Sequence, residues 1–438
     1  MNVALIVLGH LFTFVAAIAG LLLGLSFTTV EHQRFPVLRK LEGKRVSLLF
    51  TTVLSLAIVL VVNITKDVPP AFETAQGPKG EALQKATASG FDRELEDAAA
   101  ELKTKAKRFF DAAEAEFKPG SYEDAAKSYQ KSIDLLPTMS AYLNAGISWY
   151  NISKFPEAEQ AFLAGLQLAR EKEDEKFEGN FLGNIGIVYR NQGKLEAALK
   201  SHQEALEIDR KIGNPLGEAA DLGNIGNVYY QQGKLEAALK SYRESLEIDK
   251  KIGNPLGEAT ALGNIGLVYQ DQGKLEAALK SHQESLEIDK KIGNPLGEAT
   301  ALGNIGLVYQ DQGKLEAALQ SYRESLEIHR KIGNPLGEAA ALGNIGVVYR
   351  NQGKLNEALE AYQQALEIDR KIGNPLGEAN ALGNIGNVYF DQGKLDDALR
   401  SMQQAREIFK RIGARIQLQI AENNIKRIND KLLSSKKP

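Results

Sequence analysis

The sequence contains no cysteine, one tryptophan, three methionines and five histidines among its 438 residues. The absence of cysteine excludes disulfides, thiolate catalysis and cysteine-ligated metal sites. The histidines are scattered and form no HExxH or similar ligand pattern, so no metal site is predicted. A formal net charge of −3 shows no basic excess, which argues against a nucleic-acid partner.

The polar residues form no catalytic pattern. The stretch GLVYQDQGKL has the glycines and lysine of a phosphate loop, but six residues separate its glycines and leucine follows its lysine. Glu196, Glu204 and Glu207 recur at the regular spacing of a solvated outer helix face. We therefore predict that the protein is not an enzyme and binds no cofactor.

The first 65 residues are far more apolar than the rest of the chain. Residues 3–27 carry one ionisable side chain, His10, and residues 46–64 carry none; each run can cross a bilayer as a helix. No basic residue precedes the first run, which argues against a cleaved signal peptide. The sequence predicts a transmembrane hairpin in residues 1–65, in contact with lipid through residues 3–64.

The charge of the connecting loop predicts the orientation of this hairpin. The loop carries Arg34, Arg39, Lys40, Lys44 and Arg45 against Glu31 and Glu42. Because basic loops stay on the cytoplasmic side, we expect a two-pass membrane protein whose loop is cytoplasmic. The rest of the chain is then extracytoplasmic, either periplasmic or external.

Beyond the apolar runs, the chain consists of repeats. Residues 66–90 are rich in Pro, Gly, Ala and Thr and are predicted to form a linker. A period of 40 residues then dominates, and residues 251–279 are identical to residues 291–319. The predicted segments are an N-terminal helix with two shorter, divergent repeats (91–178), six 40-residue repeats (179–418), and a C-terminal capping helix and tail (419–438).

Each 40-residue unit contains two helical patterns. In one unit, Asn214 is a suitable N-cap, Pro215 fits the first helical position and Gly233 ends the first helix. The second pattern has apolar residues at helical spacing from Leu235 and stops at the next Gly-Asn pair. Two antiparallel helices per unit, joined by short turns, predict an α-solenoid.

The unit resembles the tetratricopeptide repeat (TPR). With Gly179 as position 1, the unit has Leu182 at position 4, Gly186 at 8, Tyr189 at 11, Ala198 at 20, His202 at 24 and Ala205 at 27. The longer period and the ALGNIGxVY wording are similar to the repeats of kinesin light chains and of Leu-Gly-Asn-repeat proteins. This resemblance implies an all-α fold, a right-handed α-solenoid of TPR helix pairs, here preceded by two transmembrane helices.

The resemblance also implies a binding surface. In TPR proteins, positions 2, 6, 9 and 13 of the first helix line the inner, concave wall. An asparagine amide there can both donate to and accept from an extended peptide backbone. The predicted peptide-binding residues are Asn184, Asn224, Asn264, Asn304, Asn344 and Asn384 at position 6, Asn227, Leu267 and Leu307 at position 9, and Arg190, Tyr230, Gln270, Gln310, Arg350 and Phe390 at position 12. The alternative is that each asparagine bonds a neighbouring helix and tunes stacking.

Two glycines inside each first helix need an explanation, because each costs about 1 kcal/mol of helix propensity relative to alanine. We predict that Gly186 and its equivalents at position 8 allow close approach of the second helix. Gly183 and its equivalents at position 5 are assigned to packing as well. The alternative at position 5 is close approach of a ligand backbone.

The sequence therefore predicts a membrane-anchored TPR scaffold that binds a protein or peptide partner in its concave groove, for assembly or recruitment at a membrane surface. The alternative is a structural spacer or a self-associating repeat array without a dedicated ligand.

Overall fold

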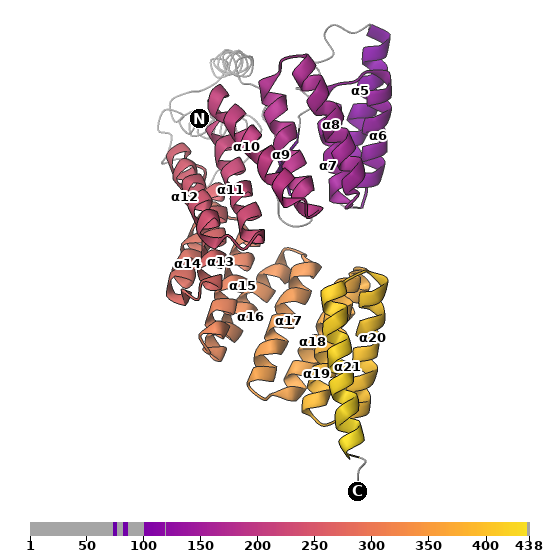
Figure 1. Cartoon of the computed structure of the whole chain (residues 1–438), viewed down its shortest axis with the longest axis vertical. Helices are drawn as coiled ribbons and strands as arrows, with labels where there is room; N and C mark the ends of the chain where they lie inside the picture. The colour runs from indigo at the N-terminus through magenta and orange to yellow at the C-terminus, as the bar shows by residue number, and fades with distance from the viewer. Residues whose placement is uncertain (1–72, 77–81, 86–99, 119, 436–438) are drawn as a thin grey trace, which may run out of the picture. The chain divides into compact units, whose positions relative to one another are not determined.

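The computed structural model describes residues 73–76, 82–85, 100–118 and 120–435. Within these residues, 17 helices follow one another from α5 to α21, and two short strands precede them (Figure 1). The predicted membrane-spanning runs, 3–27 and 46–64, lie outside the described residues, so the transmembrane hairpin stays a prediction. Among the helices that are described, none combines the length and the apolarity needed to cross a bilayer.

The helices form antiparallel pairs, and each helix packs on its neighbours in sequence. The first helices of the pairs are α5 (Ala100–Glu116), α7 (Met139–Asn151), α9 (Glu175–Asn191), α11 (Pro215–Gln231), α13 (Pro255–Asp271), α15 (Pro295–Asp311), α17 (Pro335–Asn351) and α19 (Pro375–Asp391). The second helices are α6 (Tyr122–Leu135), α8 (Phe155–Glu171), α10 (Leu195–Ile212), α12 (Leu235–Ile252), α14 (Leu275–Ile292), α16 (Leu315–Lys331), α18 (Leu355–Lys371) and α20 (Leu395–Arg411), and α21 (Arg415–Ser435) closes the array. The predicted all-α repeat solenoid is confirmed.

Two short strands lie where the sequence predicted only a linker. Strands β1 (Glu73–Gln76) and β2 (Ala82–Lys85) pair antiparallel, with Glu73 opposite Lys85 and Gln76 opposite Ala82. Their sequences, ETAQ and ALQK, lack the alternation of apolar and polar residues that signals a half-buried strand. Local pattern therefore could not reveal this hairpin.

The turns between repeats follow the predicted capping pattern. Asn214 precedes α11, and its side-chain oxygen accepts a hydrogen bond from the Gly217 N–H at 3.3 Å. The Asn214 amide donates to the buried Asp209 carboxylate at 2.8 Å, which fixes the orientation of the cap. At the other end, Gly233 has a φ of 71°, a left-handed conformation that favours glycine.

In the first five 40-residue repeats the glycine at position 8 lies under an aromatic ring, whereas Gly386 of the last lies against Met402 and the Ala398 carbonyl. A Cβ on Gly186 would come within 2.6 Å of the His202 ring, and one on Gly346 within 2.6 Å of the Tyr362 ring. The predicted close approach of the second helix is therefore confirmed. The contact is made by the ring at position 24, rather than by the small Ala198 at position 20.

Position 5 glycines have no such neighbour. A Cβ on Gly343 or Gly383 would meet no atom within 4 Å, and one on Gly303 only the Ser325 hydroxyl at 4.0 Å. An alanine would therefore fit without displacing anything. The assignment of these glycines to packing was wrong, because the neighbouring helices leave space beside this position.

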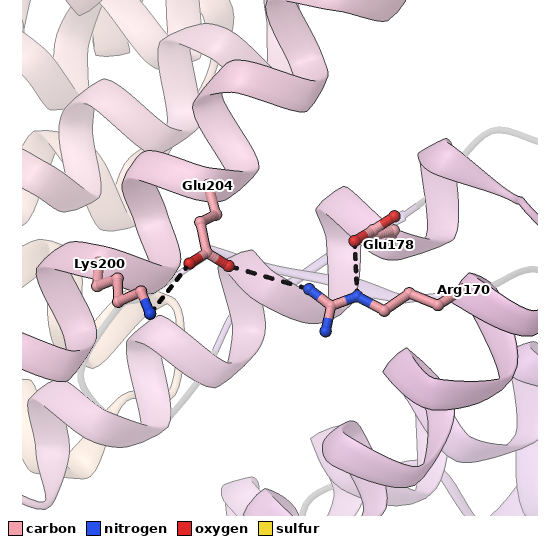
Figure 2. A network of polar contacts seen from close by, with 4 residues as sticks. All are labelled: Arg170, Glu178, Lys200 and Glu204. Atoms are coloured by element: carbon pink, nitrogen blue, oxygen red, sulfur yellow. Dashed lines mark hydrogen bonds and ion pairs between the residues drawn. The ribbon is translucent and has the colours of Figure 1, made fainter.

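Ion pairs connect the helices at the edge where each second helix ends. Arg170 Nε lies 2.8 Å from Glu178 Oε1 of α9, and its guanidinium is 4.0 Å from Glu204 Oε2 of α10 (Figure 2). Lys200 approaches the same Glu204 carboxylate at 3.6 Å. The arginine–glutamate pair recurs at Arg210–Glu218, Arg330–Glu338 and Arg370–Glu378. These pairs are solvent-accessible, so each contributes at most about 1 kcal/mol.

The two glycine columns give a matched pair of substitutions in α17. Gly346→Ala would place a methyl group against the Tyr362 ring, so we expect a loss of about 1–3 kcal/mol in the free energy of unfolding, the usual cost of overpacking. Gly343→Ala adds helix propensity in open space, so we expect a gain of up to about 1 kcal/mol. Thermal unfolding followed by circular dichroism measures both, and equal effects would contradict this account.

One buried histidine introduces a dependence of stability on pH. His282 occupies position 24 of its repeat, is fully buried, and has no hydrogen-bond partner for either ring nitrogen within the described residues. Burial lowers the pKa of His282 to about 4. Between pH 6.5 and 4 this histidine therefore binds a proton more readily in the unfolded chain than in the folded one, and its contribution to stability falls as the pH falls through this window.

The neighbouring repeat offers a control for this effect, since Tyr322 occupies the same position within almost the same sequence. We expect His282→Tyr to reduce the loss of unfolding free energy between pH 6.5 and 4 by about 2–3 kcal/mol, because the buried titrating group is gone. Urea unfolding at the two pH values measures the difference. An unchanged pH dependence would show that protonated His282 is accommodated in the fold.

Candidate functional site

The first helices of most successive repeats contact one another. Contacts link α7 to α9, α9 to α11, α11 to α13, α13 to α15, and α17 to α19. In the described part of the chain, successive second helices make fewer contacts with one another than successive first helices do. The first helices are therefore closer together and lie on the inner side of the array. Positions 2, 6, 9, 12 and 13 of these helices are called the inner wall below.

The asparagines at position 6 divide into two groups. Asn224, Asn264, Asn304, Asn344 and Asn384 are half-buried, and none of these five amides has a hydrogen-bond partner among the described residues. Asn184 differs, since it is 3% exposed and already has a partner. The five free amides do not support the alternative that each asparagine bonds a neighbouring helix.

Position 9 changes character along the wall. Asn227 accepts a hydrogen bond from the buried Tyr242 hydroxyl at 2.8 Å, so its side chain is partly committed to the fold. In the next three repeats the half-buried side chain is apolar, first Leu267, then Leu307 and Val347. Asn387 then restores a polar residue. Between α11 and α19, position 9 of the wall thus has an apolar centre with an asparagine on either side.

Several residues at position 12 bind the next repeat instead of facing open space. Gln270 donates to Asp311 at 2.6 Å, and Arg350 Nε lies 2.6 Å from Asp391. Burial, and then the Asp271 carboxylate of the next repeat, raise the pKa of Tyr230 to about 12. These predicted site residues therefore join adjacent first helices.

The other residues predicted at position 12 lie in three different environments. Arg190 is only 8% exposed and has a partner. The Phe390 ring is covered by the closing helix α21, with the Arg427 guanidinium 4.2 Å and the Lys431 amine 4.4 Å from its centroid. Gln310 is half-buried and has no hydrogen-bond partner within the described helices. Of these three, only Gln310 can meet a ligand without rearrangement.

Sequence reasoning missed one member of the asparagine column. Asn144 of α7 lies 40 residues before Asn184 and is fully buried, with its amide donating to Glu114 at 3.1 Å. The 40-residue phase alone could have found it. The sequence of its repeat differs from the LGNIG motif, and for this reason the match was not recognised.

Comparison with protein families agrees with this arrangement of helices. The tetratricopeptide-repeat model matches residues 177–251, 257–331 and 337–411, and a second tetratricopeptide-repeat model matches residues 110–175. The chain belongs to the tetratricopeptide-repeat family. No curated protein sequence matches this TPR chain significantly.

Solved structures resemble this TPR array at low sequence identity. One is a Signal Transduction ATPase with Numerous Domains (STAND) protein with a tetratricopeptide repeat sensor, from Pyrococcus horikoshii, with a TM-score of 0.54 and 18% identity over 76% of this chain and 54% of that one. Another is the apo form of RapI, with a TM-score of 0.51 and 18% identity over 63% of this chain and 99% of that one. Likeness at this level of identity shows a shared fold.

Proposed function

We propose that the protein is a scaffold that binds an extended segment of a protein partner along the inner wall of α11–α19. The observation that carries this proposal is the column of five half-buried amides that have no hydrogen-bond partner in the described part of the chain. Each can offer one acceptor and two donors to a passing peptide backbone. Unpaired polar groups that remain accessible at one position of five successive helices favour a ligand over a role in stacking.

The wall also suggests what this segment contains. The apolar centre at Leu267, Leu307 and Val347 favours apolar side chains in the middle of the bound segment. Asp271 and Asp311 are exposed on the same stretch of wall and favour basic side chains beside them. The proposed partner is therefore an extended segment whose middle carries both apolar and basic side chains.

We further propose that the scaffold works at a membrane. This rests on the two apolar runs, 3–27 and 46–64, and on the basic loop between them, which favours a two-pass anchor with extracytoplasmic repeats. Assembly or recruitment of partners at that surface would follow from such an anchor.

A triple substitution tests the groove. We expect Asn264→Ala, Asn304→Ala and Asn344→Ala together to weaken binding of a peptide selected from a display library by on the order of a hundredfold, since each lost hydrogen bond is worth about 1 kcal/mol. The melting temperature should not fall, because these amides have no hydrogen-bond partner among the described residues and alanine favours the helix. Fluorescence anisotropy and circular dichroism measure the two effects.

A matched control is available on the second helices. Glu247, Glu287 and Glu327 are exposed there at one repeated position, and their change to alanine should leave the peptide affinity unaltered. If the asparagine variant keeps its affinity, the groove proposal fails. If no peptide is selected and the chain associates with itself, the structural-array alternative gains support.

Protease digestion of spheroplasts tests the membrane proposal. With the chain expressed in a Gram-negative bacterial host, externally added protease should remove the repeats while a soluble cytoplasmic marker stays intact until lysis. This result is expected because the basic loop holds both termini outside the cytoplasm. Protection of the repeats in spheroplasts that digest after lysis would place them in the cytoplasm.

A further inference from the structure

One residue type at one repeat position has two different environments. Asn180 of α9 and Asn380 of α19 both occupy position 2 of the inner wall. Asn180 is 9% exposed, whereas Asn380 is exposed to solvent. Because the two helices belong to the same repeat array, the difference points to something that lies against the wall at α9.

The same difference holds at the other inner-wall positions. At positions 2, 6, 9 and 12, the buried residues are Ser140, Asn144, Ile147 and Tyr150 on α7 and Asn180, Asn184, Ile187 and Arg190 on α9. From α11 to α19 every residue at position 2 is exposed, and every residue at positions 6, 9 and 12 is half-buried. A step between α9 and α11 therefore separates a covered stretch of wall from an open one.

Strand β2 lies against the covered stretch. The helices that β2 chiefly contacts, within the described residues, are α7 and α9, the two whose inner walls are buried. A two-stranded hairpin with four residues in each strand is at best marginally stable in water, so it needs a surface to pack on. β1 occupies one edge of β2, and the other edge keeps backbone N–H and C=O groups that can meet polar side chains of the wall.

We propose that the β1–β2 hairpin is a built-in occupant of the inner wall at α7 and α9. The wall recognises it as it would any extended segment, through backbone groups of β2 and polar side chains of the two helices. An outside partner then has free access only to α11–α19 and must displace β2 to extend further. This competition between β2 and an outside partner rests on the proposed function of the groove. The binding of β2 to the wall at α7 and α9 does not.

The absence of cysteine allows a direct test by thiol labelling of the full chain. Asn180→Cys and Asn380→Cys place the same new thiol at the same repeat position, one on the covered wall and one on the open wall. We expect a maleimide reagent to label Asn180→Cys on the order of tenfold or more slowly, since labelling must wait for local opening. Ser140→Cys on α7 serves as a second covered site.

Proline substitutions in β2 then identify the cover. Neighbouring residues of a strand direct their N–H groups to opposite edges, so Leu83→Pro with Gln84→Pro removes one donor from each edge. In this background the thiol at Asn180→Cys should label nearly as fast as that at Asn380→Cys, whose rate should not change. Circular dichroism confirms that the helices are retained.

Two outcomes would overturn the proposal. Equal labelling of the two thiols in the parent chain would show that the wall at α9 is not covered. Slow labelling of Asn180→Cys and Ser140→Cys that persists in the proline background would show that β2 is not the cover. Neither readout involves an outside partner, so failure of the groove proposal would leave this result intact.

Discussion

The packing of each 40-residue repeat depends on the contact between the position 8 glycine of the first helix and the side chain at position 24 of the second, which is a ring in every such repeat but the last, where it is Met402. The ring occupies the volume that a Cβ at position 8 would need, so the two helix backbones can approach closely at that point. Tyr322 and Tyr362 are almost completely buried in this contact. Burial of such a ring contributes roughly 1.5–3 kcal/mol, which offsets the cost of about 1 kcal/mol for the glycine.

This contact also determines which side chains stay free. Once position 8 faces the second helix, positions 4 and 7 are buried beside it, as Leu302 and Ile305 are in α15. Position 6 then faces away from the partner helix, and Asn304 remains accessible, with no hydrogen-bond partner among the residues that the structure describes. No comparable packing gain offsets the glycine at position 5, where Gly343 has open space around it. That open space adjoins Asn344, so the proposed ligand backbone would have room at this point.

The sequence pattern correctly predicted the features of the structure that depend on residue spacing within one repeat. The cap at Asn214, the helix end at Gly233 and the close approach at Gly186 all follow from residues within one repeat. Contacts that depend on how one repeat is positioned against the next could not be predicted from the sequence. The Gln270–Asp311 bond joins residues 41 positions apart, and its formation depends on how far one first helix is shifted along the next. The pairing of β1 with β2 was equally hidden, because ETAQ and ALQK show no apolar alternation.

The near identity of the repeats raises the question of how a bound segment would find one register. A column of identical asparagine amides would bond only the backbone of the bound segment. It would make the same hydrogen bonds if that segment moved along the wall by one repeat. The inner wall breaks this symmetry in two ways. Its ends differ from its middle, because the wall is buried at Asn184 and α21 covers Phe390. Its apolar centre at Leu267 and Leu307 is also flanked by Asn227 and Asn387, so a shift would move apolar side chains of a ligand against asparagine. An apolar side chain of the ligand that lies against asparagine loses roughly 0.8 kcal/mol of binding free energy for each CH₂ group that is no longer buried. This loss favours one register over its neighbours.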